Sequence, residues 1–336
     1  DYFKDQGFPS NQDEEWKYTS LNKIVKRDFD FSSQVSTEIL AEDIEPFLCE
    51  GLDSYKLIFI NGVFNKSLSI LGYNEKFFVG SLKQGMKEMP DIINAHYGKL
   101  ADTKQSLVAL NTAMANEGAF VYVKKGVKLD KLVQILFVNT NHEESRMMQT
   151  RNLFVVEDLA EAQIFERHQA FNQGHVFSNS VTESSVGNQA HFKHFKLQND
   201  LDSSSMVDST FVKQGANSSA LVDTFAFSGE LVRNNLHFEF TGMHAEAHMD
   251  AITLLKGKSL VDHHTFVDHA VPHCQSNQLY KGIYDEKSKG VFNGKVMVRK
   301  DAQKTNAFQQ NNNLLLSDFS SIDTKPQLEI FADDVA

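Results

Sequence analysis

A turn signal that recurs at nearly even intervals constrains the fold of this chain more than any other feature of its sequence. Glycines stand at positions 174, 187, 215, 229, 242 and 257. Their spacing is roughly 14 residues with one gap of double length, and such a period indicates a repeated strand-and-turn unit. The double gap contains positions 199–203 (Asn-Asp-Leu-Asp-Ser), which are themselves typical of a turn. Between turns, apolar and polar residues alternate, so that Leu236, Phe238 and Phe240 share one face. The pattern predicts evenly spaced strands from Phe120 onward.

Two architectures produce such spacing. Antiparallel hairpins stacked into a sandwich or barrel are one, and a two-sided parallel β-helix with about 28 residues per coil is the other. The long alternating runs lack tight Asn-Gly hairpin turns, which favours the β-helix. The polar run 309–313 fits stacked amides in successive coils, and it fits a solvated loop equally well. We predict a mainly β fold with a parallel β-helix core.

The first hundred residues have a different pattern. Residues 57–62 and 66–70 are expected to form two strands joined by an Asn-Gly turn region. Apolar residues at three- and four-residue spacing predict a helix over 82–98, interrupted at Pro90, and a second helix over 106–117 that ends at Gly118. We therefore expect an N-terminal mixed, partly helical region over residues 1–105 and the β-helix core over residues 106–335.

Composition narrows the class of protein. The 33 Lys and Arg against 44 Asp and Glu give a net charge of -11, which argues against nucleic acid as a partner. Two cysteines cannot form a disulfide framework, and this favours a reducing compartment. The sequence contains no apolar stretch of ~18 residues that would span a membrane, and its first residues are too polar for a signal peptide. We expect a soluble, cytoplasmic protein without a membrane partner.

Histidine clustering suggests a metal site. Eleven of the 13 histidines lie between His168 and His273. In the densest patch a strand would point His244, Glu246, His248 and Asp250 to the same side, and two imidazoles with a carboxylate suit iron or zinc. This would make the chain a metal-dependent β-helix or jelly-roll enzyme using His244, Glu246 and His248. The alternative is that the patch is only the solvated outer face of a strand.

A second patch over residues 262–274 combines imidazole, carboxylate and thiol groups and ends in His273 and Cys274. These donors suit iron or an iron–sulfur species, but clusters normally require several thiolates. A partner chain would have to supply the rest, and otherwise the patch is structural, because a buried cysteine behaves as a small apolar residue.

Enzymatic motifs are missing from the sequence. It contains no phosphate-binding loop, no dinucleotide-binding glycine motif and no Gly-x-Ser-x-Gly elbow. Nucleotide hydrolysis by this chain is therefore not expected. A lyase-like β-helix enzyme lacks support from paired carboxylates. Polysaccharide binding along a groove is a further alternative, which would need the phenylalanines on the outer surface.

Several ordered motifs resemble the SufB/SufD family of iron–sulfur cluster assembly proteins, and more closely its SufD branch. The first is Asp-Glu-Glu-Trp-Lys-Tyr-Thr at residues 13–19. The others are residues 109–113 with 126–127, 272–276, 280–282, 292–295, 302–306, 313–317 and 330–335. The motifs extend over nearly the whole chain.

This resemblance implies a right-handed parallel β-helix core after an N-terminal helical region. It also implies a non-catalytic scaffold subunit with two partners. One is a SufB-like subunit, which pairs through the end of the β-helix, and the other is the ATPase SufC. No cofactor would be tightly bound, and an iron–sulfur cluster would form transiently at the interface with SufB. Matching family positions make His273 and Cys274 candidates for handling the cluster or its sulfur.

The C-terminus departs from the family pattern. In the family, Ala-Asp-Asp-Val is followed by a Lys-Cys-x-His-Gly segment whose histidine is implicated in cluster formation, whereas here Val335 is followed only by Ala336. We therefore expect no counterpart of that histidine or of the C-terminal helices on which SufC docks. In isolation, we expect homodimers through the β-helix end around residues 303–332. Arg233, Asn234 and Asn235 match another family segment and are expected to serve turn and inter-coil hydrogen bonding.

Overall fold

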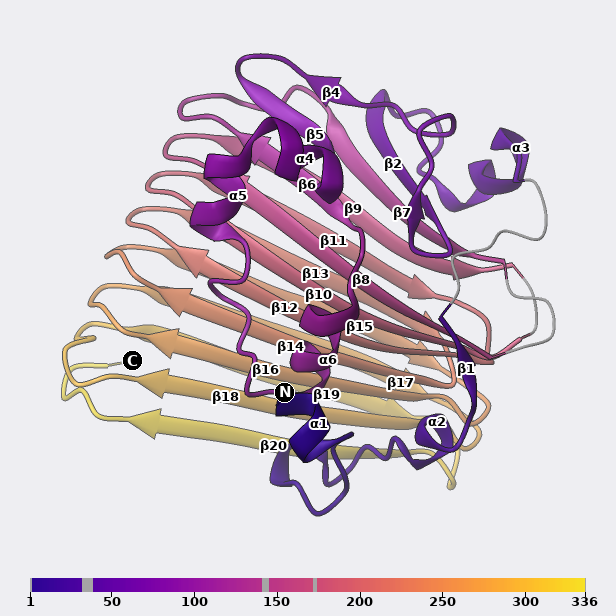
Figure 1. Cartoon of the computed structure of the whole chain (residues 1–336). Coiled ribbons are helices and arrows are strands. Elements are labelled where there is room, and N and C mark those ends of the chain that lie inside the picture. Colours follow the sequence, from indigo (N-terminus) through magenta and orange to yellow (C-terminus); the bar gives the residue numbers. More distant parts are fainter. Residues whose placement is uncertain (1, 32–38, 141–144, 172–173, 336) are drawn as a thin grey trace.

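The computed structural model shows a two-sided parallel β-helix of about seven turns (Figure 1). It describes residues 2–31, 39–140, 145–171 and 174–335. From β6 onward, successive strands alternate between an 11-stranded and a 9-stranded sheet. Val176 pairs with Ser204 and Leu231 with Leu260, so the register gives coils of the length that the glycine spacing predicts. The predicted β-helix is confirmed, and the antiparallel sandwich or jelly roll is wrong.

Both sheets run from the start of the chain to its last coil. The 11-stranded sheet consists of β20 (Ser321–Ile330), β18 (Lys289–Val298), β16 (Leu260–His269), β14 (Leu231–Phe240), β12 (Ser204–Gln214), β10 (Val176–Val186), β8 (Ser145–Val156), β6 (Ala119–Val123), β5 (Phe77–Ser81) and β4 (Gly72–Tyr73), with β1 (Phe29–Asp30) paired to β8. The 9-stranded sheet consists of β19 (Asn306–Leu315), β17 (Gln275–Tyr284), β15 (Glu246–Leu255), β13 (Ser219–Ser228), β11 (His191–Asn199), β9 (Glu161–Ala170), β7 (Leu132–Asn139), β2 (Ser54–Ile60) and β3 (Val63–Phe64).

The glycine spacing has a steric cause at the corners. A Cβ on Gly242 would lie 2.1 Å from the backbone nitrogen of Ala216 in the preceding coil, and one on Gly187 would lie 2.5 Å from the nitrogen of Asp158. Stacked corners therefore need glycine where backbones approach closely. The corner after each strand of the 11-stranded sheet from β8 to β18 also holds one non-glycine residue with positive φ: Leu159, Gln189, Asn217, His244, His273 and Lys304.

Apolar side chains from both sheets fill the space between them. Leu236, Phe238 and Phe240 are buried in this core, as their shared face predicts. Phe59, Phe154 and Phe192 belong to the same core. Many phenylalanines therefore pack inside the β-helix, which disfavours the polysaccharide-binding alternative, although Phe308, Phe319 and Phe331 near the last coil are exposed.

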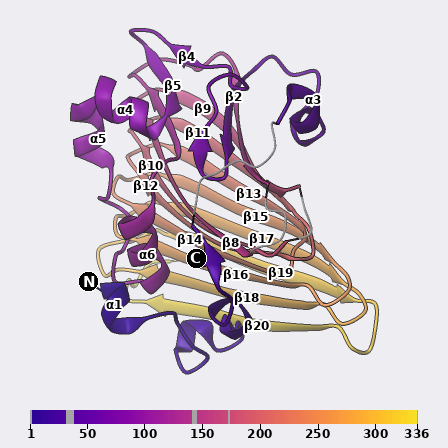
Figure 2. The same cartoon turned by 45° about the vertical axis from the view of Figure 1, so that its right-hand side comes forward.

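Helices from the first third of the chain cover the outer face of the 11-stranded sheet, as the two cartoon views agree (Figures 1 and 2). They are α1 (Tyr2–Gln6), α4 (Leu82–Glu88), α5 (Pro90–His96) and α6 (Ser106–Met114). Shorter elements of this region are η1 (Glu14–Trp16), α2 (Asn22–Val25), α3 (Ala41–Ile44) and η2 (Glu45–Phe47). The predicted break at Pro90 is confirmed, and the helix predicted over 106–117 ends earlier, at Met114.

The strand predicted over 66–70 is wrong. The chain reverses at Asn61 and Gly62, where φ is 50° and 76°, and β3 pairs with β2 immediately afterwards. Only Ile70 of the predicted segment forms a bridge, to Lys56. The Asn-Gly turn is a tight hairpin, so the return strand begins at once.

Two buried ion pairs lie on the covered outer face of the 11-stranded sheet. Arg151 donates to Glu183 at 2.7 Å, and Arg233 donates to Asp262 at 2.8 Å and stacks 3.8 Å from the centroid of the Trp16 ring. Arg233 was expected at a turn, but it lies within β14, because the turn falls at Gly229 instead. The expected inter-coil hydrogen bonding is confirmed, since Asp262 belongs to the next coil.

Candidate functional site

The last coil ends in two strands that each have a neighbour on one side only. In the described part of the chain, β19 pairs only with β17, and β20 pairs only with β18. Such edges expose a row of backbone N–H and C=O groups that can pair with another chain. We call β19 and β20 together the open end. Pro326 within β20 removes one N–H donor from this row, which is a common feature of edge strands.

Side chains that face the interior are uncovered at the open end. Val296 and Val298 of β18 are both 1% exposed, whereas their register partners in β20, Leu328 and Ile330, are 61% and 47% exposed. These two side chains occupy core positions without a further coil to bury them. Burying a leucine or isoleucine contributes about 1.5–3 kcal/mol. The open end is therefore suited to contact with another protein.

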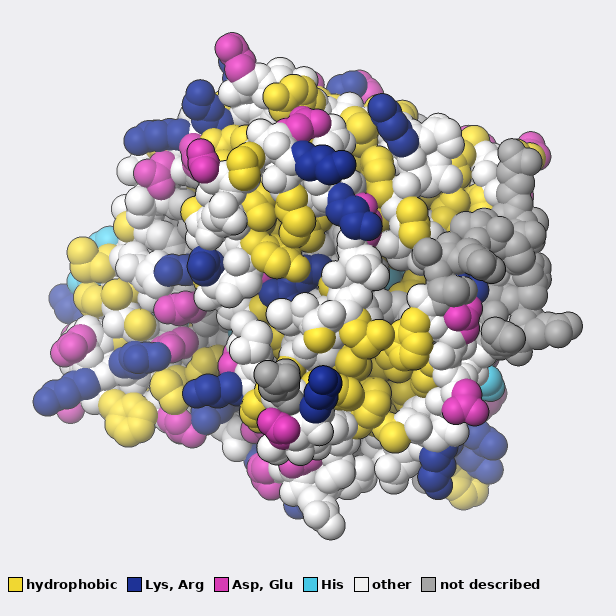
Figure 3. Space-filling model, in the orientation of Figure 1, with side chains coloured by type: hydrophobic (Ala, Val, Ile, Leu, Met, Phe, Trp, Pro, Cys, Tyr) yellow, Lys and Arg dark blue, Asp and Glu magenta, His cyan; other side chains and the backbone are white. Residues whose placement is uncertain are grey.

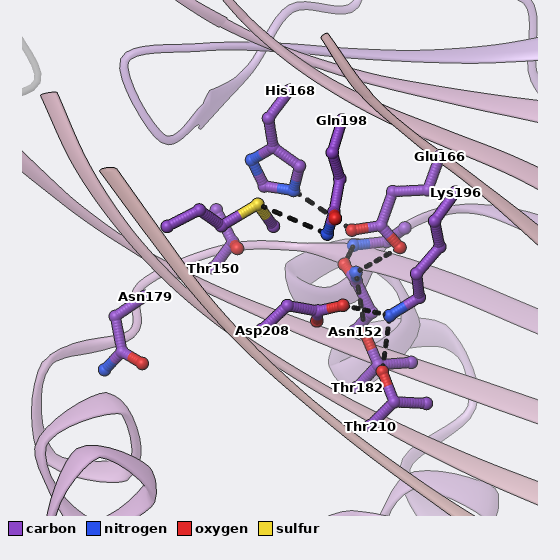
Figure 4. Close-up of polar contacts among 12 residues, drawn as sticks. Thr150, Asn152, Glu166, His168, Asn179, Thr182, Lys196, Gln198, Asp208 and Thr210 are labelled. Carbon is purple, nitrogen blue, oxygen red and sulfur yellow. Dashed lines mark hydrogen bonds and ion pairs between the residues drawn. The ribbon is translucent and has the colours of Figure 1, made fainter. Parts of the chain in front are cut away.

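The interior of the middle coils is polar rather than purely apolar. Glu166 of β9 accepts a hydrogen bond from His168 at 3.0 Å (Figure 4), and a second one from His194 at 2.9 Å. Burial alone would raise the pKa of Glu166, but these two hydrogen bonds hold it well below its usual value. Burial lowers the pKa of His194. The buried carboxylate is therefore ionised and held by two imidazoles.

A second charged group lies one coil further on. Lys196 of β11 contacts Asp208 and Thr210 of β12 across the interior (Figure 4). The cavity beside these residues has a volume of about 10 Å³. A cavity needs roughly 10–15 Å³ to hold even one water molecule. This cavity can therefore hold at most about one water molecule and is too small for a substrate.

Hydrogen bonds continue from this cluster toward the open end. The side-chain amides of Gln198 and Asn234 form two hydrogen bonds with each other, at 2.6 and 2.9 Å. A ring nitrogen of His263 is hydrogen-bonded to the Thr253 hydroxyl at 3.0 Å. Further on, Gln309 of the last coil donates to Gln278 at 3.3 Å. Asn311 then donates to Thr324 across the open end at 3.1 Å. The polar run 309–313 is thus part of strand β19, and the solvated-loop alternative is wrong.

The residues of the metal hypothesis do not share one strand face. The strand begins at Glu246, and His244 precedes it in the corner with φ of 61°, so the prediction that His244 points with Glu246 is wrong. Glu246 and His248 do lie together, with His248 Nε2 2.9 Å from Glu246 Oε1. Throughout the described residues, no group of three or more His, Cys, Asp or Glu side chains is arranged to hold a metal ion.

His273 and Cys274 are adjacent but lie in different surroundings. Cys274 is fully buried in the core, its Sγ is 3.4 Å from the carbonyl oxygen of Gly242, and burial raises the pKa of its thiol. A buried, protonated thiol is a poor nucleophile and a poor metal ligand. His273 lies in the corner, where its ring stacks on that of His244 with centroids 4.8 Å apart.

Sequence reasoning did not find the polar interior. Glu166, His194 and Lys196 alternate with other residues along their strands, but nothing in that period marks which side faces inward. A buried charge is rare without a partner, and apart from His168 the partners here come from other strands. In the described residues no helix is long and apolar enough to cross a membrane.

These features define a class: a parallel β-helix protein with a polar interior whose last described strands, β19 and β20, each have a neighbour on one side only. The chain belongs to the SufBD family. A family model described as "SUF system FeS cluster assembly, SufBD core domain" matches residues 137–336, and one described as "SufBD protein N-terminal region" matches residues 1–135.

Individual relatives cover nearly the whole chain. An iron–sulfur cluster assembly SufBD family protein of Synechocystis is 31% identical over 97% of this chain and 74% of the relative. The iron–sulfur cluster assembly protein SufD of Escherichia coli is 27% identical over 98% of this chain and 75% of the relative. The chloroplastic protein ABCI7 of Arabidopsis thaliana is 27% identical over 98% of this chain and 70% of the relative.

Proposed function

We propose that this chain is a non-catalytic scaffold subunit of a SUF-type iron–sulfur cluster assembly complex, with a role like that of SufD. Membership of the SufBD family carries the proposal, and the open end of the described residues indicates where a partner could add strands. Leu328 and Ile330 sit there at core positions with about half or more of their surface exposed, beside two unpaired strand edges. A partner with the same β-helix architecture would continue both sheets and bury these side chains.

The partner in this proposal is a SufB-like subunit docked on the open end, and a SufC-like ATPase supplies the nucleotide hydrolysis. Support comes from the similarity to SufD of Escherichia coli and from an interior cavity too small for a substrate. The iron–sulfur cluster would form transiently at the interface with the SufB-like subunit and would not be a resident cofactor. Because Cys274 is buried, His273 is the better placed of the two candidate residues for contact with a cluster.

The test is anaerobic co-purification of the chain with SufB-like and SufC-like proteins, followed by iron and sulfide analysis of the complex. Replacing Leu328 and Ile330 with aspartate should abolish the complex, because it places two charges in the buried centre of the interface. Leu159→Asp is the matched control, since Leu159 is 50% exposed in a distant corner with φ of 62°, which aspartate tolerates.

Complex formation by the double variant at wild-type yield would disprove docking at the open end. If the wild-type chain joins the complex without changing its iron and sulfide content, the scaffold role is disproved even though docking stands.

In isolation, the same end would pair two copies of the chain. Light scattering that shows a strict monomer at high concentration would contradict this homodimer.

A further inference from the structure

Two histidines that lie one full coil apart in sequence are stacked at one corner of the β-helix. His244 follows β14 and His273 follows β16, each with positive φ, at 61° and 64°. Their rings lie 4.8 Å apart between centroids with an interplanar angle of 21°. The corner is held in register by hydrogen bonds from Gln275 N to Ala245 O and from His273 N to Gln303 O, both 2.9 Å long.

The side chains at this corner are accessible. His244 is exposed and His273 is partly exposed, and both line a surface hollow of about 320 Å³. Histidine side chains are visible at the left edge of the face shown in Figure 3, where the strands of the 11-stranded sheet end. Among the described residues, no hydrogen bond or ion pair occupies a ring nitrogen of either His244 or His273, so whichever nitrogen of each ring carries the lone pair is available to a ligand.

Paired imidazoles at this separation suit a divalent transition metal. Zinc binds imidazole nitrogen at about 2.0–2.1 Å in tetrahedral geometry, so two nitrogens on one ion lie about 3.3–3.4 Å apart. The 4.8 Å separation joins the ring centroids, and the lone pairs of the stacked rings lie in the ring planes, so both rings must turn about their side-chain bonds before their nitrogens converge on one ion.

Other groups in the hollow affect the binding of a cation. Asp334 contributes a carboxylate, while Gln275 and Asn306 carry amide oxygens that line the same space. The Lys304 ammonium also lines it and opposes a bound cation. Because the described residues provide no third imidazole, thiolate or carboxylate in coordinating position, water or a partner protein would complete the coordination shell.

We propose that His244 and His273 together form a binding site for one divalent transition-metal ion of the kind that imidazole prefers, with Zn²⁺ as the probe. His273 is also the candidate that the proposed function names for contact with a cluster, but binding of Zn²⁺ by the isolated chain does not depend on docking of a SufB-like subunit. The site differs from the metal site predicted from sequence, because His273 replaces Glu246 and His248. Failure of either proposal therefore leaves the other intact.

The first experiment titrates the full metal-free chain with Zn²⁺ by isothermal calorimetry at slightly alkaline pH, where imidazole is deprotonated. We expect one binding event, weakened at least about tenfold in both His244→Asn and His273→Asn, since each removes one of two ligands. Asparagine is chosen because it tolerates positive φ, so that the corner keeps its backbone. His191→Asn and His248→Asn are the controls, and both should bind Zn²⁺ as the wild type does.

A gain-of-function variant gives a result that partial unfolding of the variant cannot mimic. Asn217 occupies the equivalent corner one coil earlier, with φ of 54°. Asn217→His places a third imidazole in the same row and should tighten Zn²⁺ binding by about tenfold or more. Lys304→Gln, which removes the opposing charge, should tighten it by a smaller factor.

Electron paramagnetic resonance with Cu²⁺ gives a second readout, because hyperfine coupling reports directly on bound nitrogen. Two imidazole nitrogens are expected in the wild type and one or none in the single variants. Unchanged Zn²⁺ affinity in both His244→Asn and His273→Asn would overturn the proposal. Loss of binding in His248→Asn alone would also overturn it and would return the site to the strand face of β15.

Discussion

The first and last coils of the β-helix bury equivalent side chains to very different extents. At the first coil, Leu57 and Phe59 of β2 are both 0% exposed, because the chain folds back and Phe64 of β3 packs on Phe59 with ring centroids 5.4 Å apart. At the last coil, Leu328 and Ile330 face the same interior and remain exposed. A solenoid needs a cap at each end, and this chain supplies only one of them within the described residues.

The two ends of the β-helix therefore contribute differently to the stability of the isolated chain and to its association with other chains. The capped end contains hairpins formed by β2 with β3 and by β4 with β5, which pair antiparallel and finish both sheets. The open end keeps two edges and a partly exposed interior. We infer that substitutions at the capped end act on folding of the isolated chain, whereas substitutions at the open end act on its contacts with other chains.

The largest expected effect comes from removing one inward-facing side chain at each end. Phe59→Ala should lower the free energy of unfolding by about 3–5 kcal/mol, because it leaves a cavity in the capped core. Leu328→Ala should lower it by less than ~1 kcal/mol, since most of that side chain already contacts solvent. Denaturant unfolding of the isolated chain measures both values. Equal losses would show that the two ends do not differ in this way.

A smaller effect per residue is expected from acid. Burial lowers the pKa of His237, His263 and His269 to about 4 each, and all three lie on β14 or β16, toward the open end. The unfolded chain binds protons near pH 6.5 while the folded chain stays neutral, so stability falls as pH drops from about 6.5 to about 4, by about 1–3 kcal/mol per histidine. The first-coil strands β2 and β5 contain no histidine.

Hydrogen exchange compared at neutral pH and at mildly acidic pH tests this difference between the ends. Amides of β14 and β16 should lose protection before those of β2 and β5. His237→Phe should reduce the loss, because its ring stacks on Phe211 at 4.7 Å and phenylalanine keeps that contact without titrating. Uniform loss of protection along the β-helix would contradict the prediction.

The smallest effect concerns the edge itself. Pro326→Thr restores a backbone N–H in β20 and should strengthen self-association a few-fold while changing the free energy of unfolding by less than ~0.5 kcal/mol. Light scattering over a concentration series measures the association. Pro9→Thr in the N-terminal segment is the control, and an equal effect of both variants would argue that the edge of β20 is not involved.

Local chemistry made much of the fold predictable. The corners were predictable because glycine is the residue that fits where backbones of neighbouring coils approach closely, as at Gly242. The break at Pro90 and the inward face of Leu236, Phe238 and Phe240 followed from equally local rules. The hairpin after Asn61 was misjudged by a few positions, because an Asn-Gly turn fixes where the chain reverses but not how long the return strand is.

The burial of the charged side chains could not be predicted from such local rules. Arg151 and Arg233 face outward from their strands, where alternation predicts solvent, and yet both are nearly fully buried under the N-terminal region. Glu166 and Lys196 face inward, where alternation predicts apolar residues. Apart from His168, which lies two residues from Glu166 in the same strand, the partners of these charges lie on other strands, at a distance in sequence that a local pattern does not carry.

The sequence by itself determined the strands, the length of a coil and the positions of the corners, since each depends on steric and hydrogen-bonding preferences of neighbouring residues. Only the tertiary structure decided what those elements bring together. One coil of the β-helix returns the chain to a neighbouring strand roughly 4.8 Å away, so His244 and His273 meet although a whole coil separates them in sequence. The same stacking leaves Leu328 and Ile330 uncovered, because the described chain offers no further coil to bury them.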